Sequence, residues 1–214
     1  MTIREKLVKR ASKAGLSLSD AAIGGLVAYF ELLRKWNRKV SLTALPVEDV
    51  GDEAIDRLLI EPVMAARYLP GKTLTTLDIG SGGGSPAIPM KLATPDMTLR
   101  MVESKTRKAA FLREAMRTLE LDRTSVDAVR FEELLAEPSL HDAVDVVTVR
   151  AVRVDPKRLV ELQSFIRRDG LLFLFGTTVP LPADALAPHL VRGAVYELLS
   201  QWGSRLEILR KMSP

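Results

Sequence analysis

The chain has no cysteine and only two histidines, and these scarcities remove several classes of function. Without cysteine there is no disulfide, no thiolate metal ligand and no sulfur nucleophile. The histidines, His141 and His189, lie outside the catalytic patterns of the sequence, so we expect them in loops or at the surface. A reaction on this chain has to proceed without cysteine chemistry and without a histidine base, and no metal site is predicted.

Long hydrophobic runs are also missing. No apolar segment approaches the roughly 20 residues of a membrane-spanning helix. The first residues, Met1-Thr2-Ile3-Arg4-Glu5-Lys6, lack the apolar middle of a signal peptide. The 214 residues are 47% hydrophobic and 27% charged, which is enough for one globular domain with a sizeable core. We expect a monomeric, cytoplasmic protein without membrane contact.

Positive charge is concentrated near the N-terminus. The formal net charge is +4, and residues 1–40 hold nine lysines and arginines against three acidic residues. Four of these cations, Arg34, Lys35, Arg38 and Lys39, lie close together. Such a segment can neutralise phosphates and steer a nucleic acid towards a site, although a solvated helix face has the same composition.

The hydropathy pattern is helical in the first part of the chain. An amphipathic run covers Ala21–Lys39, with Ser19 or Asp20 as its N-cap. A second helix is predicted over Val47–Tyr68, ending before Pro70-Gly71. We therefore predict that residues 1–70 form a helical extension.

From residue 71 onwards, strands and helices alternate. Strands are predicted at residues 73–79, 97–103, 124–129, 143–149 and 170–176, and helices at 84–93, 104–120, 131–137 and 156–168. After the proline-rich stretch Val179–Pro188, Ala194–Ser200 and Arg205–Arg210 predict an antiparallel hairpin that closes a sheet edge. The order predicts a doubly wound α/β fold, with residues 71–214 as the main domain of one compact unit.

A glycine-rich loop follows the first predicted strand, in the run Leu77-Asp78-Ile79-Gly80-Ser81-Gly82-Gly83-Gly84-Ser85-Pro86. Glycines let the backbone turn sharply and lie against a ligand. The next strand ends at Glu103, where a carboxylate can accept both hydroxyls of a ribose. The pair predicts an adenosine-type cofactor.

Two kinds of cofactor satisfy this pattern. Gly82-x-Gly84-x-x-Ala87, with Glu103 downstream, also matches the dinucleotide fingerprint. Asp78 before the turn and Pro86 early in the helix disfavour a pyrophosphate, because a pyrophosphate needs free N–H groups at the helix N-terminus. S-adenosylmethionine carries a sulfonium and an ammonium group, so an acidic strand end suits it better. A glycine-rich turn without ligand remains the plain alternative.

Ligands of open α/β sheets bind beyond the carboxyl ends of the strands. This rule places the Gly80 turn, Glu103, residues 130–132 and Arg150 along one rim. That rim is the predicted active site.

Several stretches along most of the chain share the pattern of one known family. They are Leu32-Leu33-x-x-Trp36-Asn37-x-x-Val40-x-Leu42-Thr43-Ala44, the loop from Asp78 to Pro89, Val102-Glu103-Ser104-Lys105-x-x-Lys108-x-x-Phe111-Leu112, Arg130-Phe131-Glu132, and Asp145-x-Val147-x-x-Arg150-Ala151-Val152. The chain resembles the RsmG/GidB family of small-subunit (16S) ribosomal RNA guanine-N7 methyltransferases, which use S-adenosylmethionine. The resemblance implies a Rossmann-like class I methyltransferase sheet and a ribosomal RNA or small-subunit partner.

The resemblance also implies roles for particular residues. The implied cofactor contacts are Asp78, Gly80, Gly82 and Ser85 in the loop, Glu103 on the ribose, Phe131 and Glu132 beside the adenine, and Arg150. The implied RNA contacts are Arg34, Lys35, Arg38, Lys39 and Arg150. The guanidinium of Arg150 could meet the methionine carboxylate or an RNA phosphate. Its plain alternative is a salt bridge to Asp145 or Glu132.

The implied chemistry requires no catalytic side chain. Guanine N7 has an in-plane lone pair and no proton to lose, so in-line attack on a sulfonium methyl group needs no general base. Holding the two groups collinear can supply roughly 7–11 kcal/mol through effective molarity. Positioning is therefore the predicted mechanism.

The chain departs from the family pattern in three places. Where the family has Arg/Lys-His-x-x-Asp-Ser, this chain has Arg57-Leu58-Leu59-Ile60-Glu61-Pro62, and Ser41 replaces an asparagine. In the loop, Ser85 and Ala87 replace a bulky apolar residue and a glycine. Two alternative functions stay open: a small-molecule methyltransferase or dinucleotide-dependent oxidoreductase on the same scaffold, and a non-catalytic module that binds cofactor and RNA.

Overall fold

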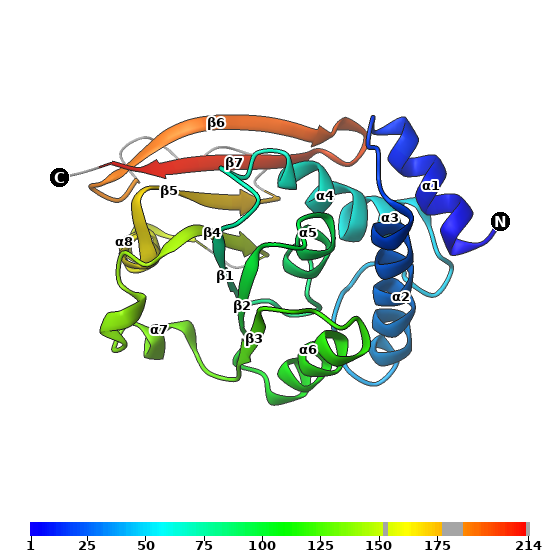
Figure 1. Ribbon diagram of the computed structural model, residues 1–214, viewed down its shortest axis with the longest axis horizontal. Coiled ribbons are helices and arrows are strands. Elements are labelled where there is room, and N and C mark those ends of the chain that lie inside the picture. Colours follow the sequence, from blue (N-terminus) through cyan, green and yellow to red (C-terminus); the bar gives the residue numbers. More distant parts are fainter. Residues whose placement is uncertain (152–153, 177–185, 213–214) are drawn as a thin grey trace.

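A single mixed sheet organises the chain, for which the computed structural model describes residues 1–151, 154–176 and 186–212 (Figure 1). The strands are β1 (Thr75–Ile79), β2 (Thr98–Val102), β3 (Thr124–Asp127), β4 (Val144–Arg150), β5 (Ile166–Phe175), β6 (Leu190–Leu199) and β7 (Ser204–Lys211). Their order is β3-β2-β1-β4-β5-β7-β6, parallel from β3 to β5 and antiparallel from there to β6. The predicted α/β fold and C-terminal antiparallel hairpin are confirmed.

Helices cover both faces of this sheet. They are α1 (Ile3–Lys13), α2 (Asp20–Asn37), α3 (Asp52–Ile55), the π-helical turn η1 (Asp56–Ile60), α4 (Glu61–Ala66), α5 (Ala87–Ala93), α6 (Thr106–Thr118), α7 (Phe131–Leu134) and α8 (Pro156–Phe165). Ser19 caps α2 as predicted, since its hydroxyl accepts the N–H of Ala22 at 3.2 Å. No helix in these described ranges combines the length and the apolarity that a bilayer crossing requires.

The core has two layers because side chains alternate along the buried strands. On β5, Phe173 and Phe175 face the layer that α1 to α6 cover, whereas Leu172 and Leu174 face α7 and α8. Figure 1 shows the two groups of helices on opposite sides of the sheet. Since the first layer also contains Phe30 of α2, residues 1–70 share a hydrophobic core with the sheet.

The prediction of a continuous helix over Val47–Tyr68 was wrong at its start and in its middle. The helical region begins at Asp52, because Val50 adopts a φ of +50° and Gly51 is the extended N-cap residue. It then changes from α-helix to π-helix at Asp56 and returns to α-helix at Glu61.

Other predicted boundaries shift by a few residues. The helix predicted at 84–93 starts at Ala87, since Gly84 has a φ of +84° that no α-helix contains. The helices predicted at 131–137 and 156–168 end at Leu134 and Phe165. Val152 and most of the stretch Val179–Pro188 lie outside the described residues.

Candidate active site

The glycine-rich loop leaves β1 in a conformation that ordinary side chains resist. Gly80, Gly82 and Gly84 all have positive φ angles, of +71°, +53° and +84°. A Cβ atom at Gly84 would lie 2.6 Å from Cδ1 of Ile88, which would have to move, and the φ of +84° would strain any other residue, so this position favours glycine. Gly80, Gly82 and Gly83 of this loop line a cavity, so contact of the loop backbone with a ligand stays a prediction that this geometry permits.

Two cavities meet at this loop, and both have Gly80 and Glu103 in their linings. One has a volume of about 400 Å³ and extends towards Arg57, Lys108 and Arg150. The other has a volume of about 270 Å³ and extends towards residues 129–132. We call the two cavities together the cleft. A separate cavity of about 510 Å³, whose lining includes residues 16–18, contains none of the predicted site residues. We call the two parts of the cleft the larger cavity and the smaller cavity.

Glu103 is held between two backbone N–H groups just beyond β2. Its Oε2 accepts the N–H of Gly82 at 2.9 Å, and its Oε1 accepts the N–H of Lys105 at 2.7 Å. The side chain is buried, and each carboxylate oxygen keeps a further lone pair for a hydroxyl donor. The position suits the predicted ribose contact and also ties the loop to β2.

Asp78 contributes a buried carboxylate with one unused oxygen. The hydroxyl of Thr148 on β4 donates to Oδ1 at 2.5 Å, whereas Oδ2 has no hydrogen-bond partner among the described residues. Burial raises the pKa of Asp78 to about 6. Asp78 is 1% exposed and lines neither cavity, so it is suited to act on the cationic end of a ligand such as S-adenosylmethionine through its charge and not by direct contact.

The raised pKa of Asp78 predicts a pH-dependent stability. In the unfolded chain this carboxyl ionises near its ordinary pKa of 3.8, but in the fold only near 6, so between these values the fold binds more protons. The contribution of Asp78 to stability is therefore greatest below pH 4 and falls as the pH rises to 6, by on the order of 2–3 kcal/mol. Urea denaturation at a series of pH values should show this fall relative to Asp78→Asn. A constant difference between the two proteins would contradict it.

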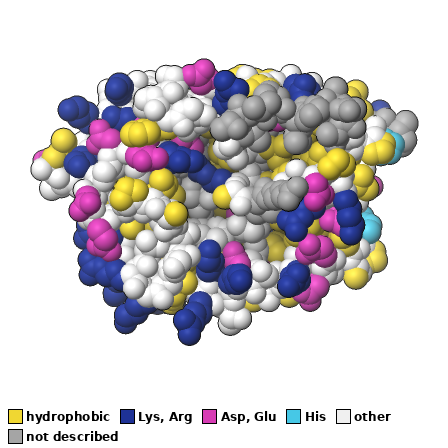
Figure 2. Space-filling model, turned by 180° about the vertical axis from the view of Figure 1, so that it is seen from behind, with side chains coloured by type: hydrophobic (Ala, Val, Ile, Leu, Met, Phe, Trp, Pro, Cys, Tyr) yellow, Lys and Arg dark blue, Asp and Glu magenta, His cyan; other side chains and the backbone are white. Residues whose placement is uncertain are grey.

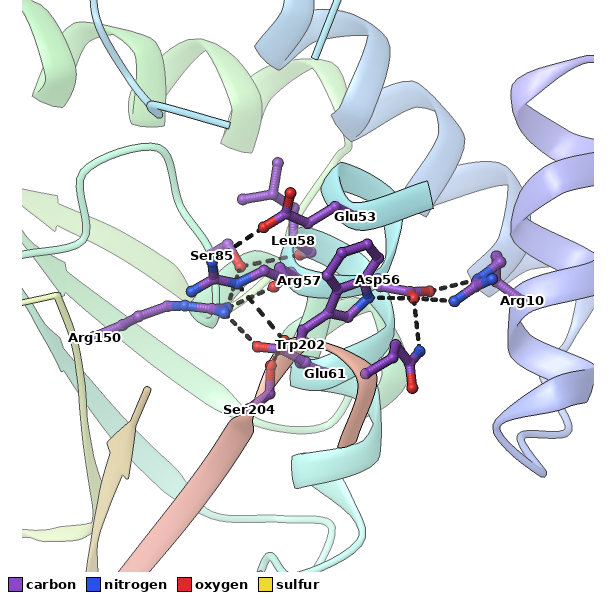
Figure 3. A network of polar contacts seen from close by, with 11 residues as sticks. Arg10, Glu53, Asp56, Arg57, Leu58, Glu61, Ser85, Arg150, Trp202 and Ser204 are labelled. Carbon is purple, nitrogen blue, oxygen red and sulfur yellow. Dashed lines mark hydrogen bonds and ion pairs between the residues drawn. The ribbon is translucent and has the colours of Figure 1, made fainter. Parts of the chain in front are cut away.

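Arg150 ends β4 and is held by residues of the helical extension (Figure 3). Its Nη1 donates to the carbonyl of Arg57 at 2.6 Å and to Oγ of Ser85 at 3.3 Å, and its Nη2 forms an ion pair with Glu61. The alternative of a salt bridge to Asp145 or Glu132 is wrong. Asp145 instead pairs with Arg167 at 2.5 Å, because both residues lie at the amino ends of β4 and β5, whereas Arg150 lies at the carboxyl end of β4.

Phe131 and Glu132 lie at the start of α7 and line the smaller cavity together with Gly80 and Glu103. Phe131 is also part of the core layer under α7 and α8, and the guanidinium of Arg158 lies 5.8 Å from the centre of its ring. The structure therefore brings all of the predicted adenosine contacts together in one place.

Four of the five predicted RNA-contacting cations lie outside both cavities, whereas Arg150 lines one of them. Arg34 and Lys35 are on the last turn of α2, and Arg38 and Lys39 follow it. Arg38 donates to both oxygens of the exposed Glu48 at 3.0 Å. Residues 42–45, which follow this basic segment in the sequence, line the 400 Å³ cavity. Figure 2 shows basic side chains gathered along the edge of the molecule on which Figure 1 draws α2 and α6.

Sequence reasoning missed several side chains that shape the site. The phenol of the buried Tyr29 donates to the carbonyl of Gly83 at 2.5 Å, which fastens the loop to α2. Oδ1 of Asn37 accepts the N–H groups of Leu42 at 2.8 Å and Thr43 at 3.0 Å. Asn37 stands in the quoted family pattern and could have been singled out, whereas Tyr29 resembles any core aromatic residue.

Comparison with known proteins places the chain in a family. Residues 23–178 match the GidB family, described as rRNA small subunit methyltransferase G. The chain belongs to this family. It is 31% identical to ribosomal RNA small subunit methyltransferase G of Acetivibrio thermocellus over 170 residues, which are 79% of this chain and 69% of the relative. It is 37% identical to the protein of that name from Neisseria gonorrhoeae over 166 residues, which are 78% of this chain and 72% of the relative.

Solved structures agree on the fold. A putative O-methyltransferase from Klebsiella pneumoniae superposes with a TM-score of 0.63 at 16% identity, covering 96% of each chain. The family assignment confirms the predicted resemblance and the predicted enzyme class, a methyltransferase that takes its methyl group from S-adenosylmethionine. It does not favour the alternatives of a dinucleotide-dependent oxidoreductase, a small-molecule methyltransferase or a non-catalytic module.

Proposed function

We propose that this chain transfers a methyl group from S-adenosylmethionine to N7 of a guanine in small-subunit ribosomal RNA. The observation that carries the proposal is the cleft around Glu103 and the unpartnered oxygen of Asp78, in a chain whose relatives are named as small-subunit ribosomal RNA methyltransferases. When bound, S-adenosylmethionine supplies an electrophilic methyl group. The protein then has to hold this group and the guanine in line.

Each predicted cofactor contact other than Arg150 has a proposed role here. Glu103 accepts the ribose hydroxyls, and Phe131 and Glu132 border the adenine. Gly80 and Gly82 offer backbone groups, and Asp78 balances the cationic end of the donor. The hydroxyl of Ser85 already donates to the carbonyl of Leu58 at 3.0 Å, so Ser85 acts through its main chain.

The larger cavity is suited to a polyanionic substrate. Its lining includes Arg57, Lys108 and Arg150 against the single carboxylate of Glu103. Cations around a cavity raise the local concentration of an anionic substrate. Because guanine N7 needs no base, the lack of a histidine in this lining is compatible with the reaction.

Methyl transfer to isolated small subunits from cells that lack this protein tests the function. We expect a label from S-adenosylmethionine in the small-subunit RNA, at one guanine that resists transfer in subunits from cells with the protein. Chemical cleavage at 7-methylguanine locates the position. Protein-free RNA as a parallel substrate shows whether the subunit is needed. A folded protein that binds the donor and labels no guanine N7 would contradict the proposal.

Charge reversal at the C-terminal end of α2 tests the proposed RNA contacts. Arg34→Glu together with Arg38→Glu is expected to weaken RNA binding roughly 10-fold, because lost phosphate contacts release fewer counterions. The slope of log K against log salt should fall by about 0.7–0.9 for each lost contact. The matched control is Arg123→Glu with Arg168→Glu, two exposed arginines at the amino ends of β3 and β5. An equal loss of RNA affinity in the two double variants would show that the RNA does not bind at Arg34 and Arg38 in particular.

We also propose that the chain acts as a cytoplasmic monomer in which residues 1–70 form the RNA-contacting extension. Sedimentation of the chain at micromolar concentration and fractionation of cells test the first two statements. A stable dimer or a membrane-bound pool would contradict them.

A further inference from the structure

The π-helical turn η1 leaves two backbone carbonyls without helical donors. The N–H of Glu61 bonds to the carbonyl of Asp56, five residues back, and not to that of Arg57. Pro62 has no N–H, so it cannot donate to the carbonyl of Leu58 as an α-helix would, or to that of Arg57 as a π-helix would. Carbonyls freed in this way need other donors.

Both freed carbonyls are used by residues that line the cleft. The carbonyl of Arg57 accepts from Nη1 of Arg150 at 2.6 Å. The carbonyl of Leu58 accepts from the hydroxyl of Ser85 at 3.0 Å, and Nη1 of Arg150 reaches the same hydroxyl at 3.3 Å. The helical extension, the glycine-rich loop and the end of β4 are therefore joined at one guanidinium.

Glu61 completes the hold on this guanidinium (Figure 3). Its side chain is 2% exposed, its Oε2 pairs with Nη2 of Arg150, and its Oε1 accepts the hydroxyl of Ser204 at the start of β7. A buried carboxylate fixed from both sides can fix the orientation of its partner. Glu61 occupies the acidic position of the departing segment Arg57-Leu58-Leu59-Ile60-Glu61-Pro62.

The contacts that orient Arg150 do not use all of its N–H groups. An arginine has five N–H donors. In the described part of the chain, Nη1 of Arg150 has two acceptors and Nη2 has one, whereas Nε has none. The side chain is 13% exposed and lines the larger cavity, so the remaining N–H groups are left for a ligand there.

We propose that Glu61 is a positioning residue, which acts with the carbonyls freed by Pro62 to orient Arg150 so that its remaining N–H groups bind an oxyanion in the cleft. This inference rests on the proposed function, which supplies two such oxyanions. One is the carboxylate of S-adenosylmethionine, and the other is a phosphate of the RNA substrate.

The test compares Glu61→Gln, Arg150→Gln and the double variant, with Glu53→Gln as the matched control. Glu53 pairs with Arg57 at 3.4 Å on the same helical segment and makes no contact with Arg150 in the described residues. Calorimetry measures the binding of S-adenosylhomocysteine and of 5′-methylthioadenosine, which lacks the carboxylate. Steady-state methyl transfer gives kcat and the KM for RNA, and thermal melting reports the fold.

We expect Glu61→Gln to weaken, by about 10-fold, the binding of the same ligand that Arg150→Gln weakens. The double variant should lose no more than Arg150→Gln alone, because the two residues act as one unit. If S-adenosylhomocysteine binds more weakly but methylthioadenosine does not, the oxyanion is the carboxylate. If only the KM for RNA rises, it is a phosphate. Glu53→Gln should match the wild type in every measurement.

Other outcomes overturn the inference. Additive losses, or wild-type binding of both nucleosides by Glu61→Gln together with an unchanged KM for RNA, would show that Glu61 does not act through Arg150. Equal weakening of both nucleosides with an unchanged KM for RNA would assign it a general structural role.

If Glu61→Gln does not fold, Pro62→Ala restores a helical N–H that competes for the freed carbonyls. Pro62→Ala should weaken, by about 3-fold, the binding of the ligand that Arg150→Gln weakens, and unchanged binding would overturn the inference. A wild-type protein that binds S-adenosylhomocysteine but methylates no RNA would defeat the proposed function alone, because the calorimetric arm still tests Glu61.

Discussion

Replacing Glu103 with alanine is expected to weaken the binding of S-adenosylhomocysteine roughly 100-fold. The carboxylate is the proposed acceptor of two ribose hydroxyls, and hydrogen bonds to a charged group contribute about 1.5–3 kcal/mol each. A combined loss near 3 kcal/mol corresponds to about two orders of magnitude in Kd. The variant also removes the acceptor of the Gly82 N–H, so the loop loses part of its tether to β2.

Isothermal calorimetry measures this loss, and Glu114→Ala is the control. Glu114 is a carboxylate on α6 that forms a surface pair with Arg117 at 2.7 Å, so its removal changes the net charge by the same amount. The control should bind like the wild type, and both variants should melt within a few degrees of it. Wild-type affinity in Glu103→Ala would remove the ribose contact from the proposed site.

Replacing Asp56 with alanine is expected to have the largest effect on stability. Asp56 is 1% exposed, and its carboxylate accepts from Nε of Arg10 at 2.7 Å and from the indole of Trp202 at 2.7 Å. Removing it leaves the mostly buried guanidinium of Arg10 with only the exposed Asp52 as a partner and leaves the indole N–H of Trp202 without its acceptor, which together cost about 3–5 kcal/mol. For a chain of this size the midpoint of thermal unfolding should fall by on the order of 10 °C.

Asp52→Ala is the matched control for this prediction. Asp52 pairs with the same arginine, Arg10, at 3.1 Å, but its side chain is 54% exposed. An exposed pair contributes about 0–1 kcal/mol, so this variant should melt within about 2 °C of the wild type. Arg10→Met combined with Asp56→Leu should recover part of the loss, since no buried charge then lacks a partner. Equal effects of Asp52→Ala and Asp56→Ala would contradict the assigned burial.

The strands and the glycine-rich loop could be predicted because their signals are local. Apolar side chains run through β4 and β5. The glycines at positions 80, 82 and 84 indicate a close turn, and all three have positive φ angles in the structure. Glu103 followed from the same logic, since parallel strands end at one edge of the sheet. These elements account for the half of the cleft that is proposed to hold the adenosine.

The other half of the cleft depends on contacts between distant parts of the chain. The alternative to a ligand contact at Arg150 was a salt bridge to Asp145 or Glu132, but its partner Glu61 lies 89 positions away in the sequence. Hydropathy periodicity does not distinguish a π-helical turn from an α-helix, so the change at Asp56 was invisible. Pro62 was visible as a departure from the family, yet its effect on two carbonyls needs the fold to be seen.

The hydrogen bond from Tyr29 to the loop carbonyl of Gly83 has a consequence for shortened forms of the protein. A fragment that starts just before β1 would keep every strand, but its glycine-rich turn would lose the phenol that supports it from outside. Deleting the N-terminal helices should therefore reduce donor affinity as well as RNA affinity. The N-terminal segment that is expected to recognise the substrate therefore also supports the loop that is proposed to bind the methyl donor.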